Sequence, residues 1–219
     1  LLTFSNNHQN DCQQGGATET ENFLSASGMQ PFRLEDGMWV ASLPDSNVIV
    51  IAVDDVAVPL DVNQVTTKIE DNKVRGKFVV LSIHWGLEYQ AGPSNRQLEL
   101  AQAWTDAGAD IIWGHHPHVL QRMELLTSRV DGHQTLVMYS LGNLLADQFM
   151  LEDAQRSALI QVIVKKGQIQ RIIIIPAKFD WERLILDFSP EPDERTRILE
   201  RINLQEFDPI FAAEYMGKN

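Results

Sequence analysis

Three histidines fall within the stretch GHHPH at residues 114–118, although the whole 219-residue chain has only six. Imidazoles this close together would repel one another if all were protonated, and a shared metal ion avoids this by binding them in the neutral form. A surface loop of unpaired histidines is the alternative. Because Pro117 keeps the backbone between His116 and His118 extended, we expect a rigid loop site rather than a helical His-x-x-x-His zinc site.

Polar side chains, the histidine cluster among them, follow four apolar runs of the sequence. The runs are LLTF before Asn7 and His8, KFVVLSI before His84, ADIIW before the histidine cluster, and QTLVMYS before Asn143. Each run is too short for a helix and lacks clean alternation, as is typical of a strand buried on both faces. Ligands of open α/β sheets bind beyond the carboxyl ends of the strands, so these strand ends are expected to share one site.

The segments between these runs indicate an α/β fold. A helix is predicted over 93–109, where Pro93 and Ser94 can open it and Gly108 can close it, and a second over 16–28. Residues 48–53 predict another strand, 61–76 a polar helix or loop, and 158–179 a hairpin that turns at Gly167. We expect one domain over 1–219, with a C-terminal surface helix region over 190–219.

The charge balance limits the class of partner. The formal net charge is −12 and the pI about 4.8, so the chain would repel phosphate backbones and nucleic acid is not expected to bind. An anionic substrate would need a bound divalent ion to offset this field. No apolar run reaches the roughly 20 residues of a transmembrane helix. Cys12 is the only cysteine, and a buried or merely tolerated thiol is expected rather than a reactive one.

Metal chemistry is the class of catalysis that remains. The sequence contains no Gly-x-Ser-x-Gly elbow, no phosphate-binding loop with Gly-Lys-Ser/Thr, and no Gly-x-Gly-x-x-Gly. Imidazole and amide oxygen together suit Mn²⁺, Fe²⁺ or Zn²⁺, as one ion or two. Taken singly, His84 is more often a hydrogen-bonded core histidine than a ligand, and His8 is more often part of a turn. Asp11 and Glu88 are the nearby carboxylates, without an evident bridging role. His133 is expected to be solvent-facing and inert.

Four motifs in order carry a resemblance to a known family. With SNNHQND, HWGLEY, AGADIIWGHHPHVLQ and MYSLGN, the chain resembles the bacterial capsule-synthesis CapA family, which is associated with poly-γ-glutamate production. The resemblance implies a calcineurin-like metallophosphatase fold, a β-sandwich flanked by helices. Family members also carry an earlier strand ending in Gly-Asp and an Asn-x-Glu stretch. These residues contain neither, so we expect the domain to be N-terminally incomplete and Leu1 to lie inside a longer protein.

The resemblance also implies roles for individual residues. It makes Asn7 and His84 metal ligands and His8 the catalytic residue that stabilises or protonates the leaving oxygen. The family's Gly-His-x-His motif maps onto GHHPH in two ways, of which we favour His116 and His118 as ligands. Four residues are left with a role in orienting the ligands or contacting the substrate: Asp11, Glu88, His115 and Asn143. His115 could instead be the ligand in place of His116.

Two functions follow from this resemblance. The first is a metal-dependent, phosphoesterase-like hydrolase in capsule or poly-γ-glutamate biosynthesis, with an anionic polymer or phosphoester as substrate. The second is a non-catalytic binding component of a polymer synthesis or export complex that keeps the fold without a full metal site. Other capsule-synthesis membrane proteins are the implied partners, and the implied location is extracytoplasmic and membrane-associated in a bacterium.

Overall fold

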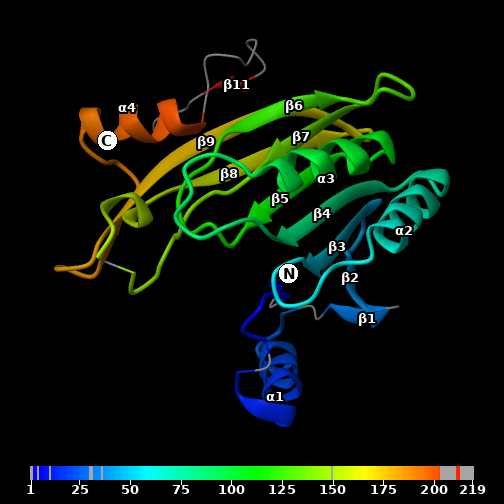
Figure 1. Cartoon of the computed structure of the whole chain (residues 1–219), viewed down its shortest axis with the longest axis horizontal. Helices are drawn as coiled ribbons and strands as arrows, with labels where there is room; N and C mark the ends of the chain where they lie inside the picture. Colours follow the sequence, from blue (N-terminus) through cyan, green and yellow to red (C-terminus); the bar gives the residue numbers. More distant parts are fainter. Residues whose placement is uncertain are drawn as a thin grey trace.

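Four parallel strands form the centre of the larger sheet (Figure 1). The computed structural model describes residues 2–3, 5–9, 11–29, 32–35, 37–148, 150–202 and 211–212. The four strands are β3 (Val48–Asp54), β4 (Phe78–His84), β5 (Ile111–His115) and β7 (Gln134–Met138). All but one of the positions in β4 are buried, as expected for a strand covered on both faces.

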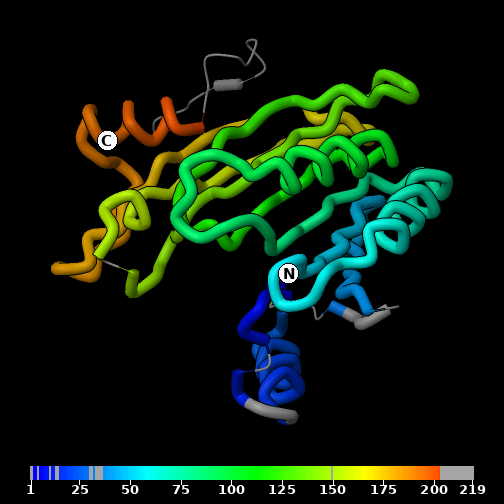
Figure 2. The backbone as a smooth tube through the Cα atoms, in the orientation of Figure 1, coloured from blue at the N-terminus to red at the C-terminus, as the bar shows by residue number. Residues whose placement is uncertain are grey.

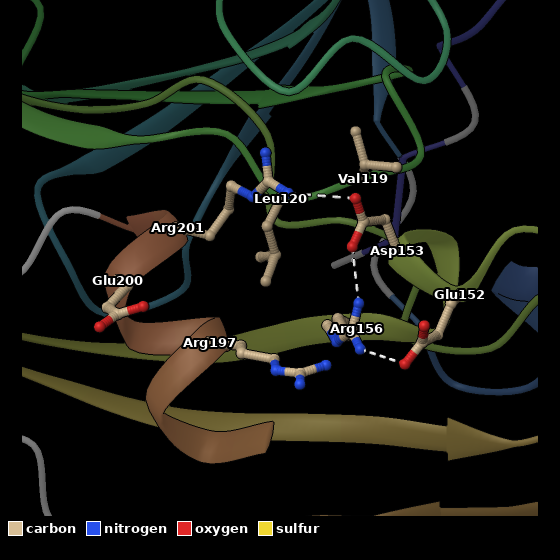
Figure 3. A pocket seen from close by; sticks show the side chains of 8 residues that line it. All are labelled: Val119, Leu120, Glu152, Asp153, Arg156, Arg197, Glu200 and Arg201. Atoms are coloured by element: carbon tan, nitrogen blue, oxygen red, sulfur yellow. Dashed lines mark hydrogen bonds and ion pairs between the residues drawn. The ribbon is translucent and has the colours of Figure 1, made fainter. Parts of the chain in front are cut away.

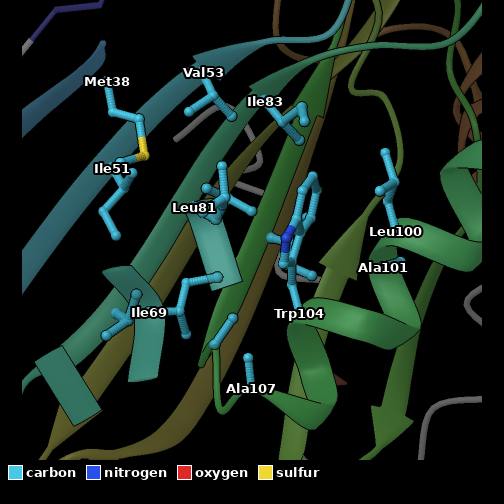
Figure 4. Packing of buried hydrophobic residues seen from close by; sticks show 14 of the residues in the cluster. Met38, Ile51, Val53, Ile69, Leu81, Ile83, Leu100, Ala101, Trp104 and Ala107 are labelled. Atoms are coloured by element: carbon cyan, nitrogen blue, oxygen red, sulfur yellow. The ribbon is translucent and has the colours of Figure 1, made fainter. Parts of the chain in front are cut away.

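Two helices connect these strands and cover one face of the sheet. In α2 (Val62–Val74) the Asp61 side chain accepts hydrogen bonds from two backbone amides, and in α3 (Asn95–Asp106) Ser94 forms a capping box. Trp104 and other apolar side chains of the helices pack against β3 and β4 (Figure 4). The central strands are therefore held rigidly, and the loops at their carboxyl ends start from fixed points.

Antiparallel strands extend the sheet at both edges. On one side lie β2 (Met38–Ser42) and β1 (Arg33–Glu35), and on the other β6 (Met123–Thr127). The seven strands take the order β1-β2-β3-β4-β5-β7-β6. The parallel strands thus occupy the middle, where their ends lie next to one another.

A second sheet faces the first. It contains the long hairpin of β8 (Arg156–Lys165) and β9 (Gln168–Asp180), with β10 (Ile185–Asp187) and β11 (Phe211–Ala212) paired to β9. Gly167 lies in the hairpin turn with φ +73°. A buried apolar cluster with side chains from both sheets fills the space between them. This sandwich with flanking helices confirms the predicted α/β fold class.

Two terminal helices lie outside the central layers. In Figures 1 and 2, α1 (Gln13–Ala26) lies apart from the sheets, whereas α4 (Pro192–Ile202) packs Ile198 and Ile202 into the second core. Of the predicted region 190–219, residues 203–210 and 213–219 lie outside the described residues. Among the helices in the described ranges, none has both the length and the apolar composition to span a bilayer.

An ion-pair network fixes α4 to the second sheet (Figure 3). The Arg156 guanidinium, 9% exposed, donates to Asp153 at 2.6 Å and to Glu194 at 2.8 Å, and also pairs with Glu152. Arg201 donates to the other oxygen of Asp153 at 3.1 Å. The hydrogen bond from Arg156 lowers the pKa of Glu194 to about 2. A pocket of about 570 Å³ beside this network is lined by three arginines and three carboxylates, so its charges balance.

Most of the predicted elements are confirmed. These are the strands over 48–53, 77–83, 109–113 and 134–140, the helices over 16–28 and 93–109, and the hairpin over 158–179. The segment 61–76, predicted as helix or loop, contains α2. The prediction of a strand over 1–4 is wrong for Leu2 and Thr3, since no strand of the described chain pairs with them, and Leu1 and Phe4 lie outside the described residues.

Candidate metal centre

Asp54, His84 and His115 form a row across three neighbouring strands. Asp54 ends β3 in register with His84, which ends β4 and is in turn in register with His115 at the end of β5. Register partners on adjacent parallel strands project to the same face of a sheet. The three side chains therefore lie side by side at the carboxyl edge, where ligands bind in sheets of this kind.

His84 is held by hydrogen bonds at both ring nitrogens. Its Nε2 lies 2.9 Å from the Asn7 amide oxygen and its Nδ1 lies 2.7 Å from Nδ1 of His115. Nε2 of His115 lies 3.1 Å from the Ser82 hydroxyl, which can donate or accept. Because the Asn7 oxygen can only accept, His84 Nε2 donates to it, His115 Nδ1 donates to His84, and Ser82 donates to His115. If both ring protons moved to the other nitrogens, with Ser82 accepting, the His84 Nε2 lone pair and the Asn7 oxygen would both be free for a shared ligand.

The loop after β5 has an unusual backbone. His116 has φ +101° and His118 has φ +62°, a region that non-glycine residues seldom adopt. A Cβ added to Gly114 would lie 2.2 Å from the Trp85 indole nitrogen, which donates to a backbone carbonyl. Gly114 is thus required for packing, while the strain is concentrated at two of the histidines. Strained conformations of this kind cluster at functional sites.

A group of metal-ligating side chains lies on this loop and on the turn after β4. One ligand atom from each of Glu88, His116 and His118 lies within 4.8 Å of the others. The turns are joined by a hydrogen bond from the Tyr89 amide to the Pro117 carbonyl at 2.8 Å. The carboxylate of Glu88 and the imidazole of His118 are 3.9 Å apart. This geometry brings a carboxylate to two histidines, a ligand combination that suits Mn²⁺, Fe²⁺ or Zn²⁺.

Asn143 orients His118 from the opposite side. Its side-chain oxygen lies 2.9 Å from His118 Nδ1, and its amide nitrogen donates to Gln148. The preceding Gly142, with φ +70°, forms a bridge to the start of β8, and a Cβ there would lie 2.4 Å from the Arg156 carbonyl oxygen. Asn143 therefore fixes one nitrogen of His118 and leaves Nε2 facing Glu88.

The His8 side chain is exposed and paired with a carboxylate. Nδ1 of His8 lies 2.7 Å from Asp11, and the two side chains are 66% and 62% exposed. Nε2 of His8 lies 3.3 Å from the Asn7 amide nitrogen. Asn7 thus links His8 to His84, since its oxygen contacts one ring and its nitrogen the other. An imidazole oriented by a carboxylate is suited to proton transfer.

The buried imidazoles of the site are neutral at physiological pH. Burial, reinforced by the neighbouring histidines, lowers the pKa of His84 to about 2. Burial and the charge of His116 lower that of His115 to about 4. The pKa of His116 is also lowered, mainly by burial and then by His118, although Glu88 and Asp54 oppose the shift. Neutral imidazole is the form that binds metal.

The metal-stripped chain is expected to lose stability as the pH falls from about 7 to 5. Unfolded histidines take up protons near their ordinary pKa of about 6.5, whereas His84 and His115 resist protonation, so the unfolded state binds more protons in this range. Each such group lowers the free energy of unfolding by at most about 1.4 kcal/mol per pH unit. Urea unfolding at pH 7, 6 and 5 measures this slope, which should be shallower in His84→Asn. A constant wild-type free energy over this range would contradict the expectation.

The geometry separates the histidines whose roles the sequence left open. His115 hydrogen-bonds to Ser82 and His84, whereas His116 lies in the group with Glu88. His116 Nδ1 is buried, and no side chain or backbone group of the described residues bonds to it. A buried nitrogen without a partner costs free energy, and a metal ligand bond would offset that cost. The residues present therefore fit a divalent ion.

One single-residue expectation is corrected. His133 is not fully solvent-facing: its side chain is 25% exposed, with Nε2 3.0 Å from the Ala109 carbonyl oxygen. Of the two alternatives for Cys12, its exposure excludes the buried thiol. Asp54 was not predicted as a site residue, although it follows an apolar strand just as His84 does. That position at a strand end was the signal that would have identified it.

An apolar cavity of about 700 Å³ is lined by residues of both sheets and reaches the row of strand ends. It reaches Ser82, His84 and His115, and most of its other lining is aliphatic or aromatic, including Val80 and Trp113. Such a lining does not favour an anionic group. Of the two sides of the site, the one with Glu88 is exposed.

Comparisons with known proteins identify the family. Residues 35–148 match the family described as "Bacterial capsule synthesis protein PGA_cap". The chain is 35% identical over 148 residues to "PGA biosynthesis protein CapA" of Bacillus subtilis (strain 168), which covers 68% of this chain and 36% of that protein. It is 31% identical over 216 residues to "Capsule biosynthesis protein CapA" of Bacillus anthracis, which covers 88% of this chain and 49% of that protein. The matched part thus spans half or less of each relative. The family match includes more than half of the chain, and the chain therefore belongs to this family of bacterial capsule synthesis proteins.

Proposed function

We propose that this chain is a metal-dependent, phosphoesterase-like hydrolase that acts in capsule or poly-γ-glutamate biosynthesis. The observation that carries the proposal is the group of Glu88, His116 and His118, whose ligand atoms lie within 4.8 Å of one another. His84 and Asn7 extend the same edge through a hydrogen bond of 2.9 Å. The names of the two relatives support the biosynthetic context.

The residues divide into ligands and a proton donor. His116, His118, His84, Glu88 and Asn7 would hold one or two divalent ions. When bound, the ions would supply Lewis-acid polarisation of a phosphoryl group and activation of a water for in-line attack. They would also offset the net charge of −12 that otherwise repels an anionic substrate.

His8 would act on the leaving group. In the resting state Asp11 accepts the Nδ1 proton of His8, which leaves Nε2 to accept from the Asn7 amide nitrogen. Once protonated, His8 would donate its Nε2 proton to the leaving oxygen, and Asp11 would stabilise the imidazolium. His115 and Asn143 would keep His84 and His118 oriented.

Metal removal and replacement test the proposal. Chelation followed by gel filtration should abolish hydrolysis of an aryl phosphate monoester or diester, and added Mn²⁺ should restore it, because anion binding and water activation both require the ion. Mg²⁺ is the matched control, since it prefers oxygen ligands. Full activity after stripping would refute metal dependence. Stoichiometric Mn²⁺ binding without hydrolysis would instead favour the non-catalytic binding component of a polymer synthesis or export complex.

A further inference from the structure

Asp54 has a carboxylate oxygen that is buried without a partner. Oδ1 accepts from the backbone amide of Val56 at 2.9 Å, whereas nothing in the described part of the chain bonds to Oδ2. An unsatisfied buried carboxylate oxygen is costly, more so than a neutral acceptor. The neighbouring Asp55 differs, because it pairs with Arg96 at 2.6 Å. The charge of Asp55 is thus satisfied within the chain, whereas the unpaired oxygen of Asp54 still needs a partner.

The surroundings of Asp54 are those of a cation site. It is in register with His84, which places it in the row of strand ends. Its charge acts on the imidazole of His116, as does that of Glu88. His116 itself is 8% exposed and has a buried nitrogen with no partner among the described residues. An acceptor oxygen and an imidazole nitrogen, both buried and both unpaired, are complementary to a shared cation.

We propose that Asp54 is a carboxylate ligand of the metal centre, next to His84 in the row of strand ends. This inference rests on the proposed metal dependence and adds to it an anionic ligand from β3. Glu88 and Asp54 would then contribute one carboxylate each. Two negative charges among neutral imidazoles balance a divalent ion better than one.

Mn²⁺ titration calorimetry on the full chain tests the assignment with Asp54→Asn. The asparagine keeps the shape and the Oδ1 acceptor, so the turn to Val56 is preserved and only the anionic oxygen is lost. We expect the Mn²⁺ affinity to fall at least about 10-fold. The melting temperature of the metal-free variant should be unchanged or higher, because a bare buried charge is removed.

Asp61→Asn is the matched control. It changes the net charge by the same amount, and asparagine caps α2 as well as aspartate does. Both variants are also titrated at about 1 M NaCl, where the Debye length is about 3 Å and through-space effects of exposed charges are screened, those of buried charges less so. A ligand effect persists at high salt. A decrease that disappears there would overturn the assignment, as would wild-type affinity in Asp54→Asn.

The outcomes separate this inference from the proposed function. If the wild-type chain binds Mn²⁺ and Asp54→Asn binds it equally well, the ligand assignment is wrong and the hydrolase proposal is unaffected. If Asp54→Asn binds weakly while the wild-type chain binds Mn²⁺ without hydrolysing any phosphate ester, the assignment is supported and the hydrolase proposal fails. If the wild-type chain binds no Mn²⁺, both are overturned.

Discussion

His116→Gly is expected to weaken Mn²⁺ binding at least about 100-fold while the fold remains intact. Removing a residue that only orients a ligand already lowers metal affinity by roughly 10- to 100-fold, and the loss of a ligand should be at least as large. The imidazole of His116 lies within 4.8 Å of the ligand atoms of both Glu88 and His118, so its removal breaks the group at its centre. Glycine adopts φ +101° without the steric cost of a side chain. The lost packing is therefore offset in part by released backbone strain. Mn²⁺ titration and thermal unfolding of the metal-free protein measure the two effects.

Lys166→Gly is the matched control for this variant. Lys166 also has a left-handed backbone, φ +53°, but it lies in the β8–β9 turn. The same substitution there should leave Mn²⁺ affinity unchanged. In His116→Gly, a shift in melting temperature of more than a few degrees would correspond to more than about 1 kcal/mol and would indicate a structural role. Wild-type Mn²⁺ affinity in His116→Gly would show that His116 is not a ligand.

The central strands could be predicted because their sequences carry one dominant signal. An uninterrupted apolar run such as 78–83 can be satisfied only by burial on both faces, and the helix of 95–106 carries its own start and stop signals in Ser94 and Gly108. The edge strands β1, β2 and β6 carry no such signal. Their pairing depends on neighbours that are distant in the sequence, and local propensity does not encode these.

The candidate site was predictable in its residue types but not in its pairings. The rule that polar residues at strand ends converge identifies His84 and the GHHPH loop, and applied to 48–53 it also identifies Asp54. The sequence does not show which of His115 and His116 is the candidate ligand. The answer depends on strand register: His115 still belongs to β5 and pairs with His84, whereas His116 begins the strained loop. Glu88 enters the group through the turn contact of Tyr89 with Pro117, a tertiary feature without a local signature.

His8→Asn is expected to reduce turnover by about 10²- to 10⁴-fold for an alkyl phosphate ester, with Mn²⁺ affinity unchanged. His8 is exposed and its Nδ1 is already paired with Asp11, so its loss should affect proton transfer rather than metal binding. An alkoxide leaves poorly unless it is protonated as the bond breaks, whereas a nitrophenolate leaves readily without a proton. The reduction should therefore be much smaller for the aryl ester. Initial rates on both substrates, with Mn²⁺ titration of the same preparation, give the comparison.

The dependence on the leaving group is what distinguishes a proton donor from a residue that merely maintains the site. The alternative is that His8 acts only by positioning Asn7, which its Nε2 contacts at 3.3 Å. Its removal would then lower the hydrolysis rates of both esters equally and would lower Mn²⁺ affinity as well. His133→Asn makes the same change at a histidine bonded to the Ala109 carbonyl, at the amino ends of the strands and away from the metal centre, and should alter neither rate. Equal losses on both esters would assign His8 to positioning. A loss confined to the poor leaving group would place the general acid in the exposed turn before α1, and the metal ligands in the rigid loops that follow β4 and β5.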